Sequence, residues 1–141
     1  MIHFFLPFTL NLFSLYDLLS SKYLWSASSA LNKLSKDITV RKTANDSFYN
    51  SDLQKILSER DINELVITGC ATDFCVDTTI SSALNKDYKV TVVKDAHTTA
   101  DRPHMDAESV IKHYNWIWDN MIPTKHKLRV VECEELIQEF K

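Results

Sequence analysis

Residues 65–76 read LVITGCATDFCV and hold the clearest structural signal in the chain. The first four are apolar or β-branched, and the only glycine of the sequence, Gly69, follows them. A short apolar run bounded by glycine predicts a buried strand, and burial on both faces favours a parallel sheet. Beyond the turn, mostly apolar side chains recur at positions 76, 79, 80, 83 and 84, which predicts an amphipathic helix opening close to Cys75.

The same alternation of strand and helix continues on both sides of this unit. β-Branched residues at period 2 mark the strands, and apolar residues at helical spacing mark the helices. Such alternation predicts an α/β fold with a mainly parallel sheet covered on both faces. The predicted strands lie at residues 37–42, 89–93 and 128–131, and the predicted helices at residues 52–60, 107–121 and 134–140.

Length and composition are those of one globular domain. The chain has 141 residues, of which 45% are hydrophobic, and 16 Lys plus Arg against 19 Asp plus Glu give a formal net charge of −3. A chain of this length can bury about 68% of its unfolded surface, enough for one core. The charge balance provides no basic field, so no nucleic acid is expected as a partner.

Three cysteines, Cys70, Cys75 and Cys133, form an odd set without a C-x-x-C pair. This spacing suggests neither a disulfide framework nor a structural zinc site. We therefore expect free thiols and a cytoplasmic protein. Cys70 directly follows the buried strand and Cys133 lies in a short terminal segment, so both are expected to be inert.

Residues 1–24 differ from the rest of the chain in their crowded aromatic and aliphatic side chains. No basic residue precedes the apolar run and no small-residue cleavage site follows it, which disfavours a signal peptide. Pro7, Asn11 and Asp17 interrupt the run and disfavour a membrane-spanning helix. We expect a buried or partly ordered core segment, with residues 25–141 as the folded domain. Membrane association through residues 1–24 is the weaker alternative.

Residues suited to chemistry follow three of the predicted strands. Lys42 stands at the exit of the first, the turn of residues 69–75 follows the second, and residues 95–99 follow the third. Ligands of open α/β sheets bind outside the carboxyl ends of the strands, so we expect these segments to meet at one rim. A helix N-terminus favours the thiolate form of Cys75, a candidate nucleophile, and Lys42 could shuttle a proton. Packing of Cys75 as a small apolar side chain is the structural alternative.

The same segments carry a family resemblance. Residues 42–53, KTANDSFYNSDL, together with residues 65–79 and the DAHTT of residues 95–99, resemble the isochorismatase-like cysteine hydrolases over about residues 25–135. The paired elements K-x-x-x-x-S-F and G-x-x-T-D-x-C-V make the resemblance specific. Members that hydrolyse isochorismate itself generally lack a cysteine at this site, so Cys75 favours the amidase-like branch.

The resemblance implies a Rossmann-like, three-layer α/β/α domain with a catalytic triad of Asp, Lys and Cys. Cys75 matches the nucleophile, which attacks a carbonyl carbon, usually of an amide, to form a covalent intermediate that water resolves. Lys42 matches the triad lysine. The peptide bond before Ala71 matches a non-proline cis bond, and the backbone N–H groups of Ala71 and Cys75 would form the oxyanion hole. A small-molecule substrate, a homo-oligomer and no cofactor are also implied.

Part of the family pattern is not found. The triad aspartate ends a first strand and opens a D-x-Q motif, which nothing in residues 1–36 reproduces; Asp17, the nearest match, lacks the glutamine and lies too close to Lys42. The nicotinamidase-type metal site also has no counterpart, because His3 is the only histidine before residue 97. We therefore expect a truncated or divergent member that lacks the first family strand and uses no metal. The resemblance implies a hydrolase of a small amide or a related carbonyl substrate or, alternatively, a catalytically impaired domain for ligand binding or assembly.

Other residues are candidates to line or shape the site. Phe48, Phe74 and His97 are candidates for a substrate pocket, with simple packing as the alternative. The residues expected to form the structural turn before the nucleophile are Gly69, Thr72 and Asp73, and Asp95 is expected to act as a turn or cap residue.

The remaining histidines and tryptophans have structural interpretations. His104 and His113 share no metal-ligand spacing and are expected on solvated faces. Trp118 belongs to the apolar stripe of its helix. Trp116 cannot share that face at a spacing of two residues, and we expect it at a subunit interface.

Overall fold

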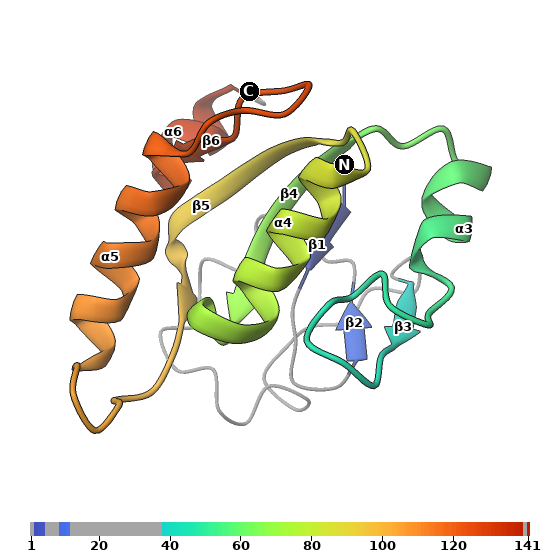
Figure 1. Ribbon diagram of the computed structural model, residues 1–141. Helices are drawn as coiled ribbons and strands as arrows, with labels where there is room; N and C mark the ends of the chain where they lie inside the picture. The colour runs from blue at the N-terminus through green and yellow to red at the C-terminus, as the bar shows by residue number, and fades with distance from the viewer. Residues whose placement is uncertain (1, 5–8, 12–37, 140) are drawn as a thin grey trace.

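The structure is a computed structural model that describes residues 2–4, 9–11, 38–139 and 141. Figure 1 traces its helices and strands along the chain. The elements are β1 (Ile2–Phe4), β2 (Thr9–Asn11), β3 (Thr39–Arg41), α3 (Leu53–Glu59), β4 (Glu64–Cys70), η1 (Thr72–Val76), α4 (Asp77–Asn85), β5 (Lys89–Thr98), α5 (Ala107–Asn120), β6 (Arg129–Val131) and α6 (Cys133–Gln138).

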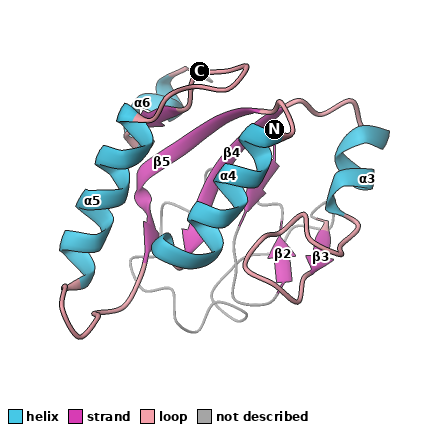
Figure 2. Ribbon diagram, in the orientation of Figure 1, coloured by secondary structure: helices cyan, strands magenta, loops and turns pink. Residues whose placement is uncertain are grey.

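The main sheet has the strand order β1-β4-β5-β6, and each neighbouring pair is parallel. β4 is buried from Leu65 to Gly69, as expected for a strand covered on both sides. Leu65 and Ile67 pack in the core cluster that includes residues of α4 and α5, whereas Val66 packs with residues of α6. Helices therefore cover both faces, which confirms the predicted α/β architecture (Figure 2).

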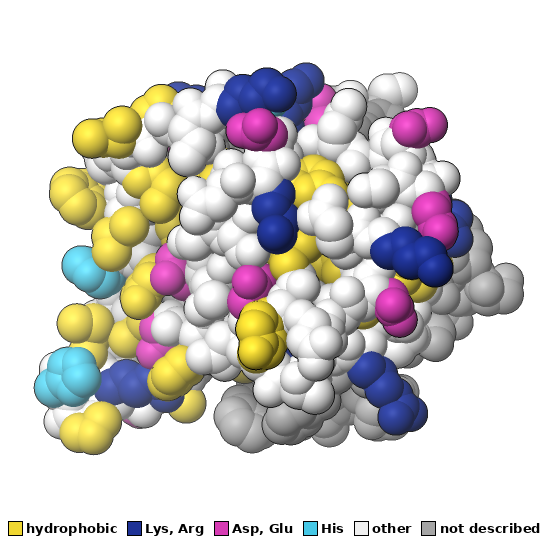
Figure 3. Space-filling view, turned by 45° about the vertical axis from the view of Figure 1, so that its right-hand side comes forward, with side chains coloured by type: hydrophobic (Ala, Val, Ile, Leu, Met, Phe, Trp, Pro, Cys, Tyr) yellow, Lys and Arg dark blue, Asp and Glu magenta, His cyan; other side chains and the backbone are white. Residues whose placement is uncertain are grey.

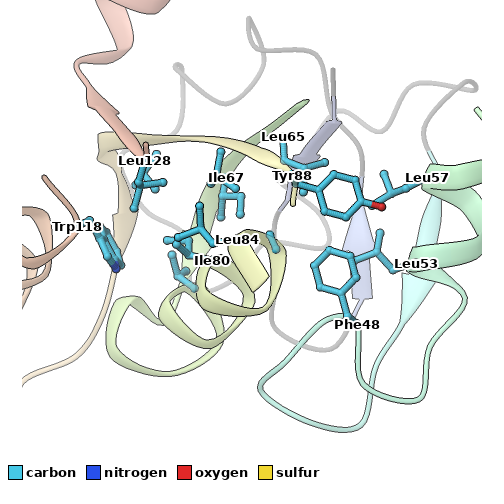
Figure 4. Close-up of a cluster of buried hydrophobic side chains, with 14 of the residues drawn as sticks. Phe48, Leu53, Leu57, Leu65, Ile67, Ile80, Leu84, Tyr88, Trp118 and Leu128 are labelled. Carbon is cyan, nitrogen blue, oxygen red and sulfur yellow. The ribbon is translucent and has the colours of Figure 1, made fainter. Parts of the chain in front are cut away.

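The larger core lies between β4, β5 and the helices α3, α4 and α5. The helices are amphipathic, and each buries its apolar stripe: α3 through Leu53 and Leu57, and α5 through Trp118, which is 1% exposed. Phe48 lies with Tyr88 beside α3, their ring centroids 5.7 Å apart (Figure 4). The predicted membership of Trp118 in the core stripe is confirmed.

The strand predicted at residues 37–42 forms at Thr39–Arg41 but lies outside the parallel sheet. It pairs antiparallel with β2 in a separate two-stranded sheet. The pattern of residues 37–42 could not reveal this, because the partner strand lies in the N-terminal apolar segment, which has no clear period. Lys42 therefore follows a strand of the small sheet, and the expectation that it leaves a strand of the parallel sheet was wrong.

The third predicted strand is longer than its sequence pattern. We expected a strand at residues 89–93 followed by a loop, but β5 continues to Thr98. Its pairing with β4 passes from Ile67↔Val92 to Gly69↔His97, so β5 carries extra residues at an irregularity. Gly69 has φ 128°, a conformation that a side chain would disfavour, which explains a glycine here.

Two stretches of the N-terminal apolar segment are strands, β1 in the parallel sheet and β2 in the small one. The rest of this segment, including Asp17, and the expected boundary at residue 25 lie outside the described residues. Within the described ranges no helix is both long enough and apolar enough to cross a membrane.

Candidate active site

The turn after β4 presents the candidate nucleophile. The Cys70–Ala71 peptide bond is cis, as the resemblance implied. The carbonyl of Ala71 accepts hydrogen bonds from the N–H groups of Phe74 and Val76, both at 3.1 Å, which closes the wide turn η1. The predicted helix therefore opens with a π-helical turn before α4 begins, and Cys75 lies half-buried within that turn.

Lys42 and Cys75 both contact Asn45, which lies in the loop of residues 42–52. The Lys42 Nζ donates to the carbonyls of Ala44 at 2.8 Å and Asn45 at 3.2 Å. The Cys75 thiol donates to the Asn45 Oδ1 at 3.6 Å. The structure thus brings the two residues of the expected Lys–Cys pair to the same residue, Lys42 to the backbone carbonyl of Asn45 and Cys75 to its side chain. Lys42 itself is buried.

Hydroxyl groups anchor this loop to α4. The N–H of Ser47 donates to the Thr79 Oγ1 at 3.2 Å, and the two hydroxyls lie 2.9 Å apart. The Thr79 hydroxyl also donates to the Asn45 carbonyl at 3.4 Å. Ser47 and Thr79 are both fully or almost fully buried, so the loop is fixed against the helix that follows Cys75.

Asp73, two residues before Cys75, forms an ion pair with Arg102. The Arg102 Nε and Nη2 donate to the two carboxylate oxygens at 2.7 and 2.8 Å, and the Thr99 hydroxyl donates at 2.6 Å. Burial alone would raise the pKa of Asp73, but these hydrogen bonds outweigh it, and the pKa lies below its ordinary value. Asp73, predicted as a turn residue, thus links the turn η1 to the segment after β5 through these hydrogen bonds.

Phe74 is the predicted pocket residue that remains accessible. It is 49% exposed, and the Arg102 guanidinium lies over its ring at 5.0 Å from the centroid. Phe48 is buried in the core, where the Lys86 ammonium lies 5.5 Å from its ring centroid. The structure therefore does not bring the two phenylalanines together at the surface.

His97 lies in β5 and not in the expected loop. Its Nδ1 is 2.9 Å from the Thr72 hydroxyl, and its Nε2 is 3.0 Å from the Asn115 Oδ1. Because the Asn115 Nδ2 donates to the Lys94 carbonyl, the Asn115 oxygen accepts, which assigns the proton of the neutral ring to Nε2. Burial lowers the pKa of His97 and favours this neutral form. Thr72 is thereby tied to the core behind the turn.

The other two cysteines differ from Cys75 in their surroundings. Burial, followed by the nearby Cys75 and Asp73, raises the pKa of Cys70. Burial also raises the pKa of Cys133 to about 11, with contributions from Asp95 and Glu132. Asp95 lies within β5 and not in the expected loop, and it accepts a hydrogen bond from the Cys133 N–H at 2.9 Å at the start of α6.

Two features lie apart from the thiol. A cavity of about 310 Å³ sits at the amino-terminal ends of β4 and β5, and the ion pairs Lys89–Glu64 and Arg129–Glu139 line it. His104 and His113 are exposed, as expected, and the described residues bring no three of His, Cys, Asp and Glu together as a metal site.

Charged side chains of both signs lie on one face of the molecule (Figure 3). On the face shown in Figure 3, basic and acidic side chains are interspersed, and apolar side chains gather toward one edge. Trp116 is 65% exposed on α5, a position compatible with the expected interface.

Neither Asn45 nor Arg102 stands out in the sequence, because each lies in a polar loop far along the chain from the turn that it contacts.

Fold and site together define an α/β domain with a cysteine in the turn at the carboxyl end of a buried parallel strand and a lysine held close by. A model of the isochorismatase domain matches residues 17–117, and the chain belongs to the isochorismatase family.

Curated relatives and solved structures agree with this assignment. The isochorismatase family protein YddQ of Bacillus subtilis is 36% identical over 70 residues, which are 50% of this chain and 39% of YddQ. The ureidoacrylate amidohydrolase RutB of Caulobacter vibrioides is 42% identical over 60 residues, 43% of this chain and 27% of RutB. The crystal structure of a cysteine hydrolase from Pseudomonas syringae superposes with a TM-score of 0.70 at 27% identity, over 77% of this chain and 51% of that one. The chain thus spans well under half the length of these two curated relatives.

Proposed function

We propose that the chain is a cysteine hydrolase that cleaves the carbon–nitrogen bond of a small amide or a related carbonyl substrate. The observation that carries the proposal is the half-buried Cys75 thiol at the end of the turn after β4, with the Lys42 ammonium bonded to the same asparagine. The similarity to RutB, whose name describes an amidohydrolase, supports an amide substrate.

In the first half of the reaction the Cys75 thiolate attacks the substrate carbonyl carbon and forms a carbon–sulfur bond. The carbonyl π electrons move to the oxygen, where the N–H groups of Ala71 and Cys75 would stabilise the negative charge. When the oxyanion collapses, the carbon–nitrogen bond breaks, and the Lys42 ammonium gives its proton to the leaving nitrogen.

In the second half water attacks the thioester carbon and passes a proton to the neutral Lys42 amine. The carbon–sulfur bond breaks, the carboxylic acid leaves, and the thiolate and ammonium are restored. Phe74, exposed beside the thiol in sequence, is the side chain that we expect to contact the substrate. We further infer a cytoplasmic enzyme that forms homo-oligomers.

The test measures amine or ammonia release from a panel of small ureido, carbamoyl and carboxamide compounds. We expect Cys75→Ser to abolish turnover and Lys42→Met to lower it by about 10²–10⁴-fold, the usual effect of losing one acid–base group. Cys133→Ala, a cysteine change in the other core cluster, and Lys55→Met, an exposed lysine change, are the matched controls. Wild-type turnover in the Cys75→Ser variant would refute the proposal.

A further inference from the structure

Asn45 makes two kinds of contact that together join the lysine to the cysteine. Its backbone carbonyl accepts from the Lys42 Nζ at 3.2 Å and from the Thr79 hydroxyl at 3.4 Å. Its side-chain Oδ1 accepts from the Cys75 Sγ at 3.6 Å. One residue therefore fixes its main chain to the proton donor and presents its amide to the reacting atom.

The main chain around Asn45 is well anchored. Lys42 also bonds to the Ala44 carbonyl at 2.8 Å, and Ser47 is fixed to Thr79 through both its N–H and its hydroxyl. Only the two side-chain torsions of Asn45 remain to be set, so the amide reaches the thiol at a small entropic cost. This arrangement is what a preorganised contact to a nucleophile requires.

A side-chain amide can form a hydrogen bond with a cysteine sulfur whether the sulfur is a thiol or a thiolate. Its oxygen accepts from a thiol, and its nitrogen carries two donors that can bond to a thiolate after half a turn about the last torsion. Hydrogen bonds to charged groups are stronger than those between neutral groups. The bond from the amide nitrogen to the thiolate is therefore stronger than the bond from the thiol to the amide oxygen that it replaces. A carboxylate at the same place would repel a thiolate, and an alkyl group would bond to neither form.

We propose that Asn45 is a further catalytic residue of this site, whose side-chain amide contacts the Cys75 sulfur and turns from acceptor to donor when the thiol loses its proton to solvent water. The inference rests on the proposed cysteine hydrolase function. Its consequence is that the thiolate is stabilised by a neutral donor, while the Lys42 ammonium, bonded to the Asn45 backbone carbonyl, stays protonated for the leaving nitrogen.

The experiment measures the rate constant for alkylation of Cys75 by iodoacetamide at pH 7.5 in the full chain, read by peptide mass spectrometry. We expect Asn45→Ala to slow the reaction by about tenfold, because the donor to the thiolate is lost. Asn45→Asp, which keeps the size of the side chain, should slow it at least as much because of like-charge repulsion. Asn85→Ala, an exposed asparagine change at the far end of α4, is the matched control and should leave the rate unchanged.

An asparagine that merely covers the thiol gives the opposite result, since its removal would expose the sulfur and speed alkylation. Unchanged or faster alkylation in both Asn45 variants would therefore overturn the inference. Cys133 in the same sample reports folding, because it reacts only when the buried core opens. If Cys75→Ser keeps full turnover, the proposed function fails; if only the Asn45 variants match the wild type, Asn45 alone is misassigned.

Discussion

The ion pair between Asp73 and Arg102 allows a direct test of how the turn η1, which holds Cys75, is stabilised. Replacement of Arg102 by alanine removes two charge-assisted hydrogen bonds from a carboxylate whose side chain is only 14% exposed, leaving the Thr99 hydroxyl as its described partner. Breaking a fully buried pair costs about 3–5 kcal/mol. Since the Arg102 side chain is 23% exposed, solvent offsets part of this, and we expect a loss of about 2–3 kcal/mol in the free energy of unfolding.

The pair Arg129–Glu139 is the matched control, because its shortest contact is also 2.7 Å but its side chains are 49% and 42% exposed. Arg129→Ala should therefore cost less than about 1 kcal/mol. Both variants are measured by urea unfolding at pH 7. Equal losses would refute the reasoning, since they would mean that burial does not decide the strength of these pairs.

The pH dependence gives an independent check of the same pair. The pKa of Asp73 is lowered in the folded chain, so its stabilisation is fully present above the unfolded carboxyl value of about 3.9. The stabilisation disappears as the pH falls through the lower folded value. The difference in stability between the wild type and Arg102→Ala should therefore shrink below about pH 4, and a difference that stays constant there would contradict the assignment.

Three further predictions concern other parts of the chain. The pKa of His97 is lowered in the folded chain, so its contribution to the free energy of unfolding is fully present above about pH 6.5 and is lost as the pH falls toward the folded pKa. We therefore expect the melting temperature of His97→Gln to fall less between pH 7.5 and 5.5 than that of the wild type. An equal fall in both proteins would contradict this. Asp95→Ala should cost about 1 kcal/mol in urea unfolding through the lost cap of α6, whereas the exposed Asp119→Ala should not. Among the cysteines, Cys133 should be alkylated most slowly, because it is 5% exposed and its pKa is about 11; faster labelling of Cys133 than of Cys75 would show that this core opens readily.

The parts of the fold that the sequence predicted are those governed by local patterns. β4 and α4 were predicted because a continuous apolar run and a helical stripe each reflect burial along a single element. β5 was predicted too short, because Lys94 and Asp95 end the apolar pattern while pairing with β4 resumes at His97. The polar histidine tolerates burial there through its bonds to Thr72 and Asn115, which no local pattern reveals.

In the candidate site, too, the sequence predicted the residues that belong to a local motif but not those that depend on tertiary contacts. Cys75 and Lys42 follow from a motif, since their spacing to neighbouring residues is visible in the chain. Asn45 and Arg102 depend on contacts that span 30 and 29 residues, and nothing in their own segments distinguishes them from ordinary polar loop residues. The sequence therefore did not predict the residues that contact the candidate catalytic groups, because those contacts arise only from tertiary packing.

The buried hydroxyl pair of Ser47 and Thr79 joins two segments that follow different sheets. Lys42 follows a strand of the small antiparallel sheet, whereas Cys75 lies in the turn η1 after β4 of the parallel sheet. The Ser47–Thr79 pair holds the loop after Lys42 against the helix that follows Cys75. Local opening of this loop away from α4 would separate lysine from thiol, a subglobal event at a fraction of the total stability. The Ser47 amide, hydrogen-bonded to Thr79, would report it directly, and its hydrogen exchange rate sets an upper limit on the fraction of molecules in which the site is disassembled.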